Sequence, residues 1–444
     1  MSEEKSAQEI MDQSLKYNFF SWTVQSKVKT LALAGGEGCY FWDVDGNRYL
    51  DFISQLMCTN AGHQHPKIVS AIKDQADKLY FAAPKFTTQV RGELGELLAQ
   101  VTPDNLTKVL FTLSGAESNE NAIKFVRDYT GKFKIIARYR GYHGATYGAM
   151  TVSGDIRRTK IEPGIPGVVH VFDPYCYRCS FKRERETCDL ECVSHIEEVI
   201  HYEDPEKIAA IFMEGVTGSN GIFVPRDDYW PAVRDLCDKY NILLVSDEVM
   251  SGFGRTGEWF AVDNWDVKPD IITMAKGLTG SALPLGAVAV SADIADYFWD
   301  RMLWMGLTYN GHPMSCAAGL AAVEVYQEEG LIENSKKMGQ IMKAELRKMQ
   351  DGHPSIGEFR SIGLFGVIEL VKDHGTREPI VDWMAGETAL MEQLYKELMA
   401  RGVYTFLTRN WLFLAPPLIV TEKELKEGLG AIDEVLNLAD KAVK

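Results

Sequence analysis

Residues 243–288 read LLVSDEVMSGFGRTGEWFAVDNWDVKPDIITMAKGLTGSALPLGAV, and this stretch decides the fold. It holds three short apolar runs, and the first two lead directly to charged side chains, Asp247 and Lys276. Short apolar runs without alternation predict strands that are covered on both faces, as in a parallel sheet. Ligands of such sheets bind at the carboxyl ends of the strands. Asp247 and Lys276 are therefore candidate functional residues.

Similar apolar, β-branched runs occur on both sides of this stretch. They predict further strands, with helical patterns or loops between most of them. The clearest helical patterns cover residues 115–131, which end on a glycine, and residues 227–240. This alternation predicts an α/β fold with a mainly parallel sheet between layers of helices. The further predicted strands lie at residues 108–113, 134–140, 209–215 and 285–291.

The two ends of the chain have a different pattern. Residues 39–52 predict a hairpin around the turn pair Asp45-Gly46. In the last hundred or so residues, two long helical patterns bracket short predicted strands at 365–371, 403–409 and 411–417. Thr421 and Glu424 have the spacing of a capping box. We therefore expect a smaller α+β domain built from both termini. The expected boundaries are 1–60 for the N-terminal arm and part of the small domain, 61–325 for the large domain, and 326–444 for the C-terminal small domain.

Composition excludes several classes of function. The chain has 444 residues, of which 46% are apolar and 25% charged, and its formal net charge is −15. An acidic surface repels nucleic acid and anionic membranes, so neither is an expected partner. No apolar run approaches the roughly 20 residues of a membrane helix, and the polar, acidic N-terminus does not resemble a signal peptide. We expect a cytoplasmic protein whose eight cysteines are reduced.

Three features together predict a site for pyridoxal phosphate (PLP). A lone lysine at a strand end is usually solvated, but Lys276 is accompanied by Asp247, a carboxylate that needs a partner if buried. Ser114-Gly115-Ala116 forms a strand-to-helix turn of small residues, which exposes the first N–H groups of a helix to an anion. An amine can form a Schiff base with the PLP aldehyde, an acid can pair with the ring nitrogen, and a helix N-terminus can hold the phosphate.

With these residues in view, the sequence resembles the class III, or ω-type, aminotransferases of PLP fold type I. The resemblance runs from about Tyr40 to the C-terminus, and its most specific part is 243–288. It implies a mainly parallel seven-stranded sheet sandwiched by helices, a smaller α+β domain from the two termini, and a PLP-dependent aminotransferase. The subgroup that is closest in appearance acts on taurine and β-amino acids. The other motifs that carry the resemblance are SGAESNENAIK (114–124), RYRGYHGAT (138–146) and GLTYNGHPMSCAAGLAA (306–322).

The resemblance also implies roles for individual residues. Lys276 would be the Schiff-base lysine and Asp247 the partner of the ring nitrogen. Because one of the implied contacts crosses to the neighbouring subunit, the resemblance predicts a homodimer, or a tetramer built from two dimers, with shared active sites. The other implied cofactor contacts are Val249 and Tyr142 on the two ring faces, Gly115 and Ala116 at the phosphate, and Thr308 at the phosphate of the neighbouring subunit's cofactor.

The substrate is predicted less sharply. Many ω-aminotransferases hold the acceptor carboxylate with an arginine just before the Pro-Pro pair of the C-terminal domain, a position that Phe406 occupies here. Arg409 and Arg157 are the two candidate replacements, and each would otherwise form a surface salt bridge. Trp22 is a candidate pocket wall, with a dimer contact as the alternative. We expect a donor of the taurine, β-alanine or 3-aminobutyryl type, and 2-oxoglutarate or pyruvate as acceptor.

Some alternatives stay open at this stage. The same fold could catalyse another PLP reaction, such as that of an aminomutase, racemase or decarboxylase, or the chain could be a binding protein without catalysis. Transamination needs no metal, and none is expected at the active site. Four cysteines in the segment 176–192 nevertheless have spacing that could bind zinc, although the inner gap is shorter than in common zinc modules. These are Cys176, Cys179, Cys188 and Cys192.

Overall fold

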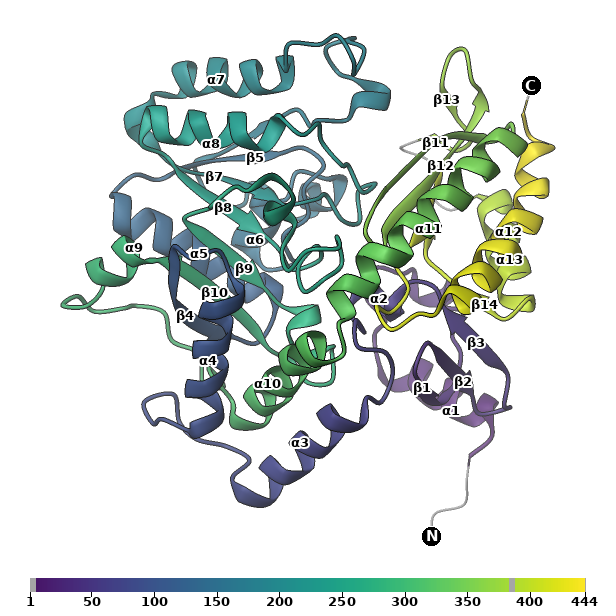
Figure 1. The fold of residues 1–444 in the computed structure, drawn as a ribbon, viewed down its shortest axis with the longest axis horizontal. Helices are drawn as coiled ribbons and strands as arrows, with labels where there is room; N and C mark the ends of the chain where they lie inside the picture. The colour runs from purple at the N-terminus through teal and green to yellow at the C-terminus, as the bar shows by residue number, and fades with distance from the viewer. Residues whose placement is uncertain (1–4, 383–387, 444) are drawn as a thin grey trace.

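The computed structural model describes residues 5–382 and 388–443. Figure 1 shows a larger lobe on the left, built around one sheet, and a smaller lobe on the right that contains both chain termini. The expected domain boundaries at residues 60 and 325 stay a prediction.

The large lobe contains a seven-stranded sheet with the order β4-β10-β9-β8-β7-β5-β6. Strands β9, β8, β7, β5 and β6 pair in parallel, whereas β10 runs antiparallel to both of its neighbours. The predicted strands are confirmed, and the sheet gains one more edge strand, β6. The bounds are β4 Leu106–Thr112, β5 Lys134–Arg138, β6 Val168–Val171, β7 Ile208–Glu214, β8 Leu243–Asp247, β9 Ile271–Met274 and β10 Gly286–Ser291.

The central strands are apolar along their length because both faces of the sheet are covered. Successive side chains of a strand point to opposite faces. In β7, Ile211 packs in one hydrophobic core and the next residue, Phe212, packs in the other. Figure 1 shows helices in front of and behind this sheet. The helices of this lobe are α3 Pro66–Lys78, α4 Gln89–Val101, α5 Gly115–Thr130, α6 Tyr147–Val152, α7 Glu191–Glu203, α8 Tyr229–Tyr240, α9 Ala292–Tyr297 and α10 Pro313–Glu328.

The small lobe joins the two ends of the chain. One sheet has the order β1-β2-β3-β14, and its parallel β3–β14 pair links the N-terminal hairpin to the C-terminal region. A second sheet has the order β11-β12-β16-β15, with β13 paired to β12. The predicted α+β unit from both termini is confirmed. The strands are β1 Leu33–Glu37, β2 Tyr40–Asp43, β3 Arg48–Asp51, β11 Ile356–Ile362, β12 Phe365–Asp373, β13 Glu378–Pro379, β14 Val403–Tyr404, β15 Leu407–Thr408 and β16 Trp411–Leu414.

The helices of the small lobe also follow their sequence signals. The capping box at Thr421 and Glu424 is formed, and it starts α13 Glu422–Asp440. Helices α11 Leu331–Gly352 and α12 Ala389–Ala400 pack near it, while α1 Ala7–Tyr17 and the short α2 Ser54–Met57 belong to the N-terminal part.

One prediction needs a correction. Residues 403–409 were expected to form one short strand, but they form two pieces in different sheets. The chain leaves β14 at Tyr404 and enters β15 at Leu407. Between them Thr405 is buried and its Oγ1 donates a hydrogen bond to the Phe413 carbonyl, which anchors the crossing. An apolar run alone does not reveal such a change of sheet.

Candidate active site

The carboxyl ends of the parallel strands gather the predicted catalytic residues at one edge of the large sheet. Asp247 is the last residue of β8 and is paired with Thr273 of the neighbouring β9. Lys276 follows β9 by two residues and begins the 3-10 helix Lys276–Thr279. Its φ of +47° places it in the left-handed region, so the chain turns sharply where the amine is presented.

The Lys276 amine lies in a low-dielectric setting with charges around it. The side chain is only partly exposed, and no residue in the described part of the chain makes a hydrogen bond to its amine. Burial lowers its pKa below that of an ordinary lysine, and Arg157 acts in the same direction. The carboxylates of Asp247 and Glu214 oppose this shift. An amine with a lowered pKa is more often uncharged at neutral pH, as a nucleophile or base requires.

Asp247 is a buried carboxylate whose partners are hydrogen-bond donors rather than arginines. Its Oδ2 accepts a hydrogen bond from Asn119 Nδ2 at 2.7 Å and lies 2.7 Å from His143 Nδ1. Its Oδ1 accepts a hydrogen bond from the Val249 N–H at 3.0 Å. These contacts orient the carboxylate. His143, which is itself buried, thus serves as a hydrogen-bonding partner of Asp247.

The N-terminus of α5 has the properties of an anion site. Ser114 caps this helix by accepting a hydrogen bond from the Glu117 N–H. The preceding N–H groups, of Gly115 and Ala116, have no hydrogen-bond partner among the residues that the structure describes. A Cβ on Gly115 would lie 2.7 Å from Cγ1 of Val249, so only glycine allows this close approach. The turn therefore fits a phosphate, and with Lys276 and Asp247 on the same sheet edge it fits PLP.

The structure brings Tyr142, Trp22 and Arg157 together. The Arg157 guanidinium carbon lies 3.8 Å from the centroid of the Tyr142 ring, and Trp22 meets that ring edge-on at 6.3 Å. Arg157 also lies 5.4 Å from the Trp22 ring, which is 62% exposed. Tyr142 follows β5, and its N–H donates to Glu214 Oε2 at 3.2 Å. Three predicted site residues from separate segments thus form one cluster near Lys276.

Arg409 reaches the same cluster from the small lobe. Its Nη1 donates to Asn220 Oδ1 at 3.2 Å, and Asn220 Nδ2 donates to Asp155 Oδ2 at 3.1 Å. Asp155 in turn binds the guanidinium of Arg157, whose Nε donates to Oδ2 at 2.7 Å. Burial lowers the pKa of Arg409 to about 10, with a further contribution from Arg157. The two arginines that the sequence offered as alternatives therefore belong to one network.

Thr308 is not brought into this cluster within one chain. It lies on an exposed turn before α10. Within residues 5–382 and 388–443, it makes no side-chain hydrogen bond to any of the other predicted site residues. Its predicted role requires a neighbouring subunit and stays a prediction.

Sequence reasoning missed several residues that shape the site. The sequence could have indicated Asn119, because Asn119 lies one helical turn beyond Gly115 in α5, on the buried side of the helix. Asp155 and Asn220 carried no such signal. They are 65 positions apart and meet only in the folded chain.

The four cysteines of segment 176–192 are free thiols, and two of them contact arginines. Arg226 Nη1 lies 3.1 Å from Cys188 Sγ, and Arg185 Nη1 lies 3.6 Å from Cys176 Sγ. No group of three or more His, Cys, Asp or Glu side chains in the described ranges is arranged to hold a metal ion. Likewise, none of the described helices combines the length and the apolar character that crossing a membrane requires.

Comparison with known proteins agrees with this geometry. The family model described as Aminotransferase class-III matches residues 23–436. The solved structure of taurine:2-oxoglutarate aminotransferase from Bifidobacterium kashiwanohense, in complex with PLP and glutamate, is 42% identical, has a TM-score of 0.95 and covers 99% of each chain.

Two curated relatives extend the comparison. Leucine/methionine racemase from Thermococcus litoralis is 36% identical over 404 residues, which cover 89% of this chain and 88% of the racemase. Adenosylmethionine-8-amino-7-oxononanoate aminotransferase from Methanocaldococcus jannaschii is 35% identical over 437 residues, covering 93% and 94%. The family match spans most of the chain, and the fold and the set of side chains at the sheet edge agree with it. The chain therefore belongs to the class-III aminotransferases and is a PLP-dependent transaminase of fold type I.

Proposed function

We propose that this enzyme transfers the amino group of an acidic ω- or β-amino compound to a 2-oxo acid. The donor is of the taurine, β-alanine or 3-aminobutyryl type, and the acceptor is 2-oxoglutarate or pyruvate. The observation that carries the proposal is the Arg157 guanidinium, 3.8 Å from the Tyr142 ring centroid and close enough to Lys276 to influence its pKa. A cation at this point of the site binds the acid group of a substrate whose amine is held at Lys276.

Lys276 and Asp247 carry the catalytic roles in this proposal. PLP, when bound, accepts the amino group and delocalises the electrons of the substrate's carbon–hydrogen bond. Nζ of Lys276 takes the proton from the carbon that bears the donor's amine and later returns it, and its lowered pKa suits this exchange. Asp247 would pair with the ring nitrogen, and Asn119 and the Val249 N–H already hold its carboxylate in place.

The remaining cofactor contacts follow from positions around these two residues. Gly115 and Ala116 would bind the phosphate through their N–H groups, and Val249, which lies close to Gly115, would cover one ring face. Tyr142 would stack on the other face. Thr308 completes the phosphate site of a second copy, so the active form is a homodimer or a tetramer built from two dimers, in the cytoplasm.

Arg157, Arg409 and Trp22 form the substrate end of the site. Both arginines are fixed around Asp155, and Trp22 closes the side of the cluster that faces solvent. The name of the Bifidobacterium neighbour, a taurine:2-oxoglutarate aminotransferase, supports an acidic donor of this size.

A screen of donors against acceptors tests the proposal. Taurine, β-alanine and 3-aminobutyrate are each combined with pyruvate and 2-oxoglutarate, and the amino acid formed from the acceptor is measured. We expect turnover with at least one acidic donor, and much slower turnover with n-propylamine, which lacks the acid group. Equal rates with acidic and uncharged donors would contradict the role of the arginines.

Racemisation is the second candidate, because a racemase from Thermococcus litoralis is among the relatives. A racemase needs no acceptor, whereas a transaminase without an acceptor stops after the first half-reaction, because no 2-oxo acid takes up the amino group. Incubation of the loaded enzyme with L-leucine or L-methionine in the absence of any 2-oxo acid separates the two. Accumulation of the D-enantiomer over many turnovers would favour the racemase.

A further inference from the structure

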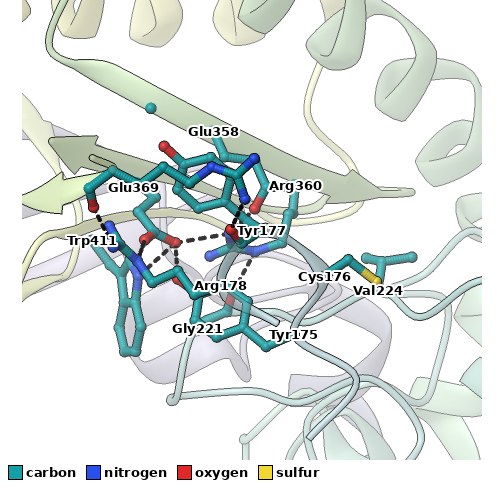
Figure 2. Close-up of polar contacts among 12 residues, drawn as sticks. Tyr175, Cys176, Tyr177, Arg178, Gly221, Val224, Glu358, Arg360, Glu369 and Trp411 are labelled. Atoms are coloured by element: carbon teal, nitrogen blue, oxygen red, sulfur yellow. Dashed lines mark hydrogen bonds and ion pairs between the residues drawn. The ribbon is translucent and has the colours of Figure 1, made fainter. Parts of the chain in front are cut away.

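The turn between residues 214 and 222 is held at both of its ends. At its start, Glu214 Oε1 accepts a hydrogen bond from the Gly218 N–H at 2.9 Å. At its end, Arg360 Nε donates to the Gly221 carbonyl at 3.0 Å. Figure 2 shows Arg360 between this carbonyl and the buried carboxylate of Glu369, to which its Nη1 donates at 2.8 Å. The turn is therefore clamped between the large sheet and the strands of the small lobe.

Gly221 allows the turn to approach the aromatic rings of Phe223 and Trp411 closely. Its φ is +119°, a value that favours glycine. A Cβ there would lie 3.0 Å from both the Phe223 ring and the Trp411 ring. The backbone on either side of Asn220 consequently has little freedom to move.

Asn220 lies inside this turn and is 1% exposed. Its amide bridges two charged groups of opposite sign. Nδ2 donates to Asp155 Oδ2 at 3.1 Å, and Oδ1 accepts from Arg409 Nη1 at 3.2 Å. A carboxylate can only accept and a guanidinium can only donate, so the orientation of the amide is determined by its partners. A short, neutral side chain that offers one donor and one acceptor is what this gap requires.

We propose that Asn220 is a positioning residue that holds Arg409 and, through Asp155, Arg157 as one receptor for the acid group of the substrate. This inference rests on the proposed function. The Asp155 carboxylate accepts hydrogen bonds from the Arg157 side chain and from the Arg157 backbone N–H, the latter at 2.8 Å. Burial opposes ionisation of Asp155, but Arg157 and Asn220 outweigh it and keep its pKa below the usual value. Asp155 is therefore a fixed negative point that Asn220 connects to Arg409.

The charges of this network favour an acid group as ligand. The guanidinium groups of Arg157 and Arg409 outnumber the single carboxylate of Asp155, and Arg140 lies close enough to lower the pKa of Arg409 as well. This excess of positive charge suits a sulfonate or a carboxylate. Ser219, whose Oγ accepts from Arg157 Nη2 at 3.0 Å, fixes one more donor of that arginine. The Nη1 group of Arg157 has no hydrogen-bond partner among the described residues, and it is the donor left for the substrate.

The test replaces Asn220→Leu, which removes both hydrogen bonds without changing the charge. We expect KM for taurine or β-alanine, and for 2-oxoglutarate, to rise about 10- to 100-fold, because hydrogen bonds to charged groups are lost. We expect kcat to fall by much less. Ethanesulfonate has the acid group of taurine but no amine. Its Kd for the holoenzyme, measured by calorimetry, should rise by the same factor as KM. The half-reaction with n-propylamine, followed without any 2-oxo acid by the absorbance of the bound cofactor, uses no acid group and should keep its wild-type rate.

Asn105→Leu is the matched control. Asn105 precedes β4 at the opposite end of the sheet, and its Nδ2 donates to the Pro269 carbonyl at 2.8 Å. We expect this variant to lose stability without any change in the Kd of ethanesulfonate. If Asn220→Leu and Asn105→Leu behave alike, Asn220 has only a structural role and the inference is overturned.

A second pair of variants covers the case in which Asn220→Leu does not fold. Asn220→Asp places a carboxylate against Asp155, and we expect weakened ethanesulfonate binding. Adding Asp155→Asn again places an amide donor beside a carboxylate and restores the total charge, so binding should be partly recovered. Absence of recovery would contradict the bridge. A wild-type enzyme that neither uses acidic donors nor binds ethanesulfonate would instead refute the proposed function.

Discussion

Asp247 and Glu369 are both almost fully buried carboxylates, but their surroundings are opposite. Asp247 is held by an amide, an imidazole and a backbone N–H. Glu369 is 0% exposed and is surrounded by Tyr175, Trp411 and two guanidinium groups, from Arg178 and Arg360 (Figure 2). Burial alone would raise the pKa of Glu369, but Arg360, Tyr175 and Arg178 outweigh it and lower the pKa to about 2.

The difference separates a functional acid from a structural one. Two arginines already neutralise Glu369, so it has no charge to offer a ligand, and it joins the strands of the small lobe to the segment around Arg178. Asp247 has no arginine partner among the described residues; Asn119, His143 and the Val249 N–H hold it, and our proposal assigns it to the ring nitrogen of PLP. We therefore expect changes at the Asp247 site to affect turnover, and changes at the Glu369 site to affect stability.

The largest effect is expected from Lys276→Ala. In the proposed function this variant loses both the amine that joins the cofactor and the group that moves the proton, so kcat should fall by about 10⁴-fold or more. Steady-state assays with the best donor from the screen measure it. Lys268→Ala is the control, because Lys268 pairs with Asp104 on the surface. Near-normal turnover of the Lys276→Ala variant would show that Lys276 is not the catalytic amine, and this site could then not be contrasted with the structural site around Glu369.

Asp247→Asn is expected to lower kcat by about 10²- to 10³-fold, because a fixed charge that faces the reacting group is lost. Asp270→Asn is the matched control. Asp270 lies at the amino end of β9, in the same sheet, and binds Arg234 at 2.9 Å. We expect the control to affect the thermal midpoint and not kcat. Equal losses of kcat in both variants would show that Asp247 only supports the sheet.

Glu369→Gln should reduce the stability of the protein and leave kcat almost unchanged, the opposite of what we expect for Asp247→Asn. Removing one member of a buried ion pair leaves uncompensated arginines, which we expect to reduce the free energy of unfolding by about 3–5 kcal/mol. The value of kcat in the folded enzyme should change by less than about threefold. Urea titration and initial rates measure the two quantities, and Glu397→Gln, in an exposed pair with Arg401, is the control. A large loss of kcat with unchanged stability would reverse our assignment.

The same carboxylate predicts how stability changes with pH. Its folded pKa of about 2 lies below the ordinary value of 4.5, so its stabilisation is complete above about pH 4.5 and is lost as the pH falls towards 2. The difference in unfolding free energy between wild type and Glu369→Gln should therefore be constant near neutral pH and shrink in acid. A difference that instead disappears between pH 6 and 8 would point to another group.

The smallest effect is expected from His143→Phe. One of the two side-chain partners of Asp247 is lost while Asn119 and the Val249 N–H remain, so kcat should fall about tenfold. His170→Phe is the control, since His170 lies 3.2 Å from the Val152 carbonyl and does not contact Asp247. A loss as large as that of Asp247→Asn would mean that His143 itself takes part in proton transfer.

The sequence predicted the large sheet and both catalytic candidates because their signals are local. Apolar runs marked the strands, and Lys276 and Asp247 followed directly from the ends of those runs. The hairpin at Asp45-Gly46 and the capping box at Thr421 depend on neighbouring residues in the same way. The exchange of sheets within residues 403–409 was not predicted, because it depends on which strands are already present to pair with.

The substrate end of the site shows the limit of sequence reasoning most clearly. From the sequence, Arg157 and Arg409 were alternatives, and Asp155 and Asn220 had no assigned role. In the folded chain Asn220 meets Asp155 across 65 positions and Arg409 across 189.

The amino-acid sequence by itself determined the fold class, the sheet edge to which we assign the chemistry, and the amine and acid presented there. Tertiary structure alone decided which arginines meet, what separates them and which carboxylate stays free for a ligand. The physical reason is range. Backbone periodicity and turn chemistry act between residues a few positions apart, whereas the hydrogen bonds of a buried polar network form only when distant segments are packed against one another.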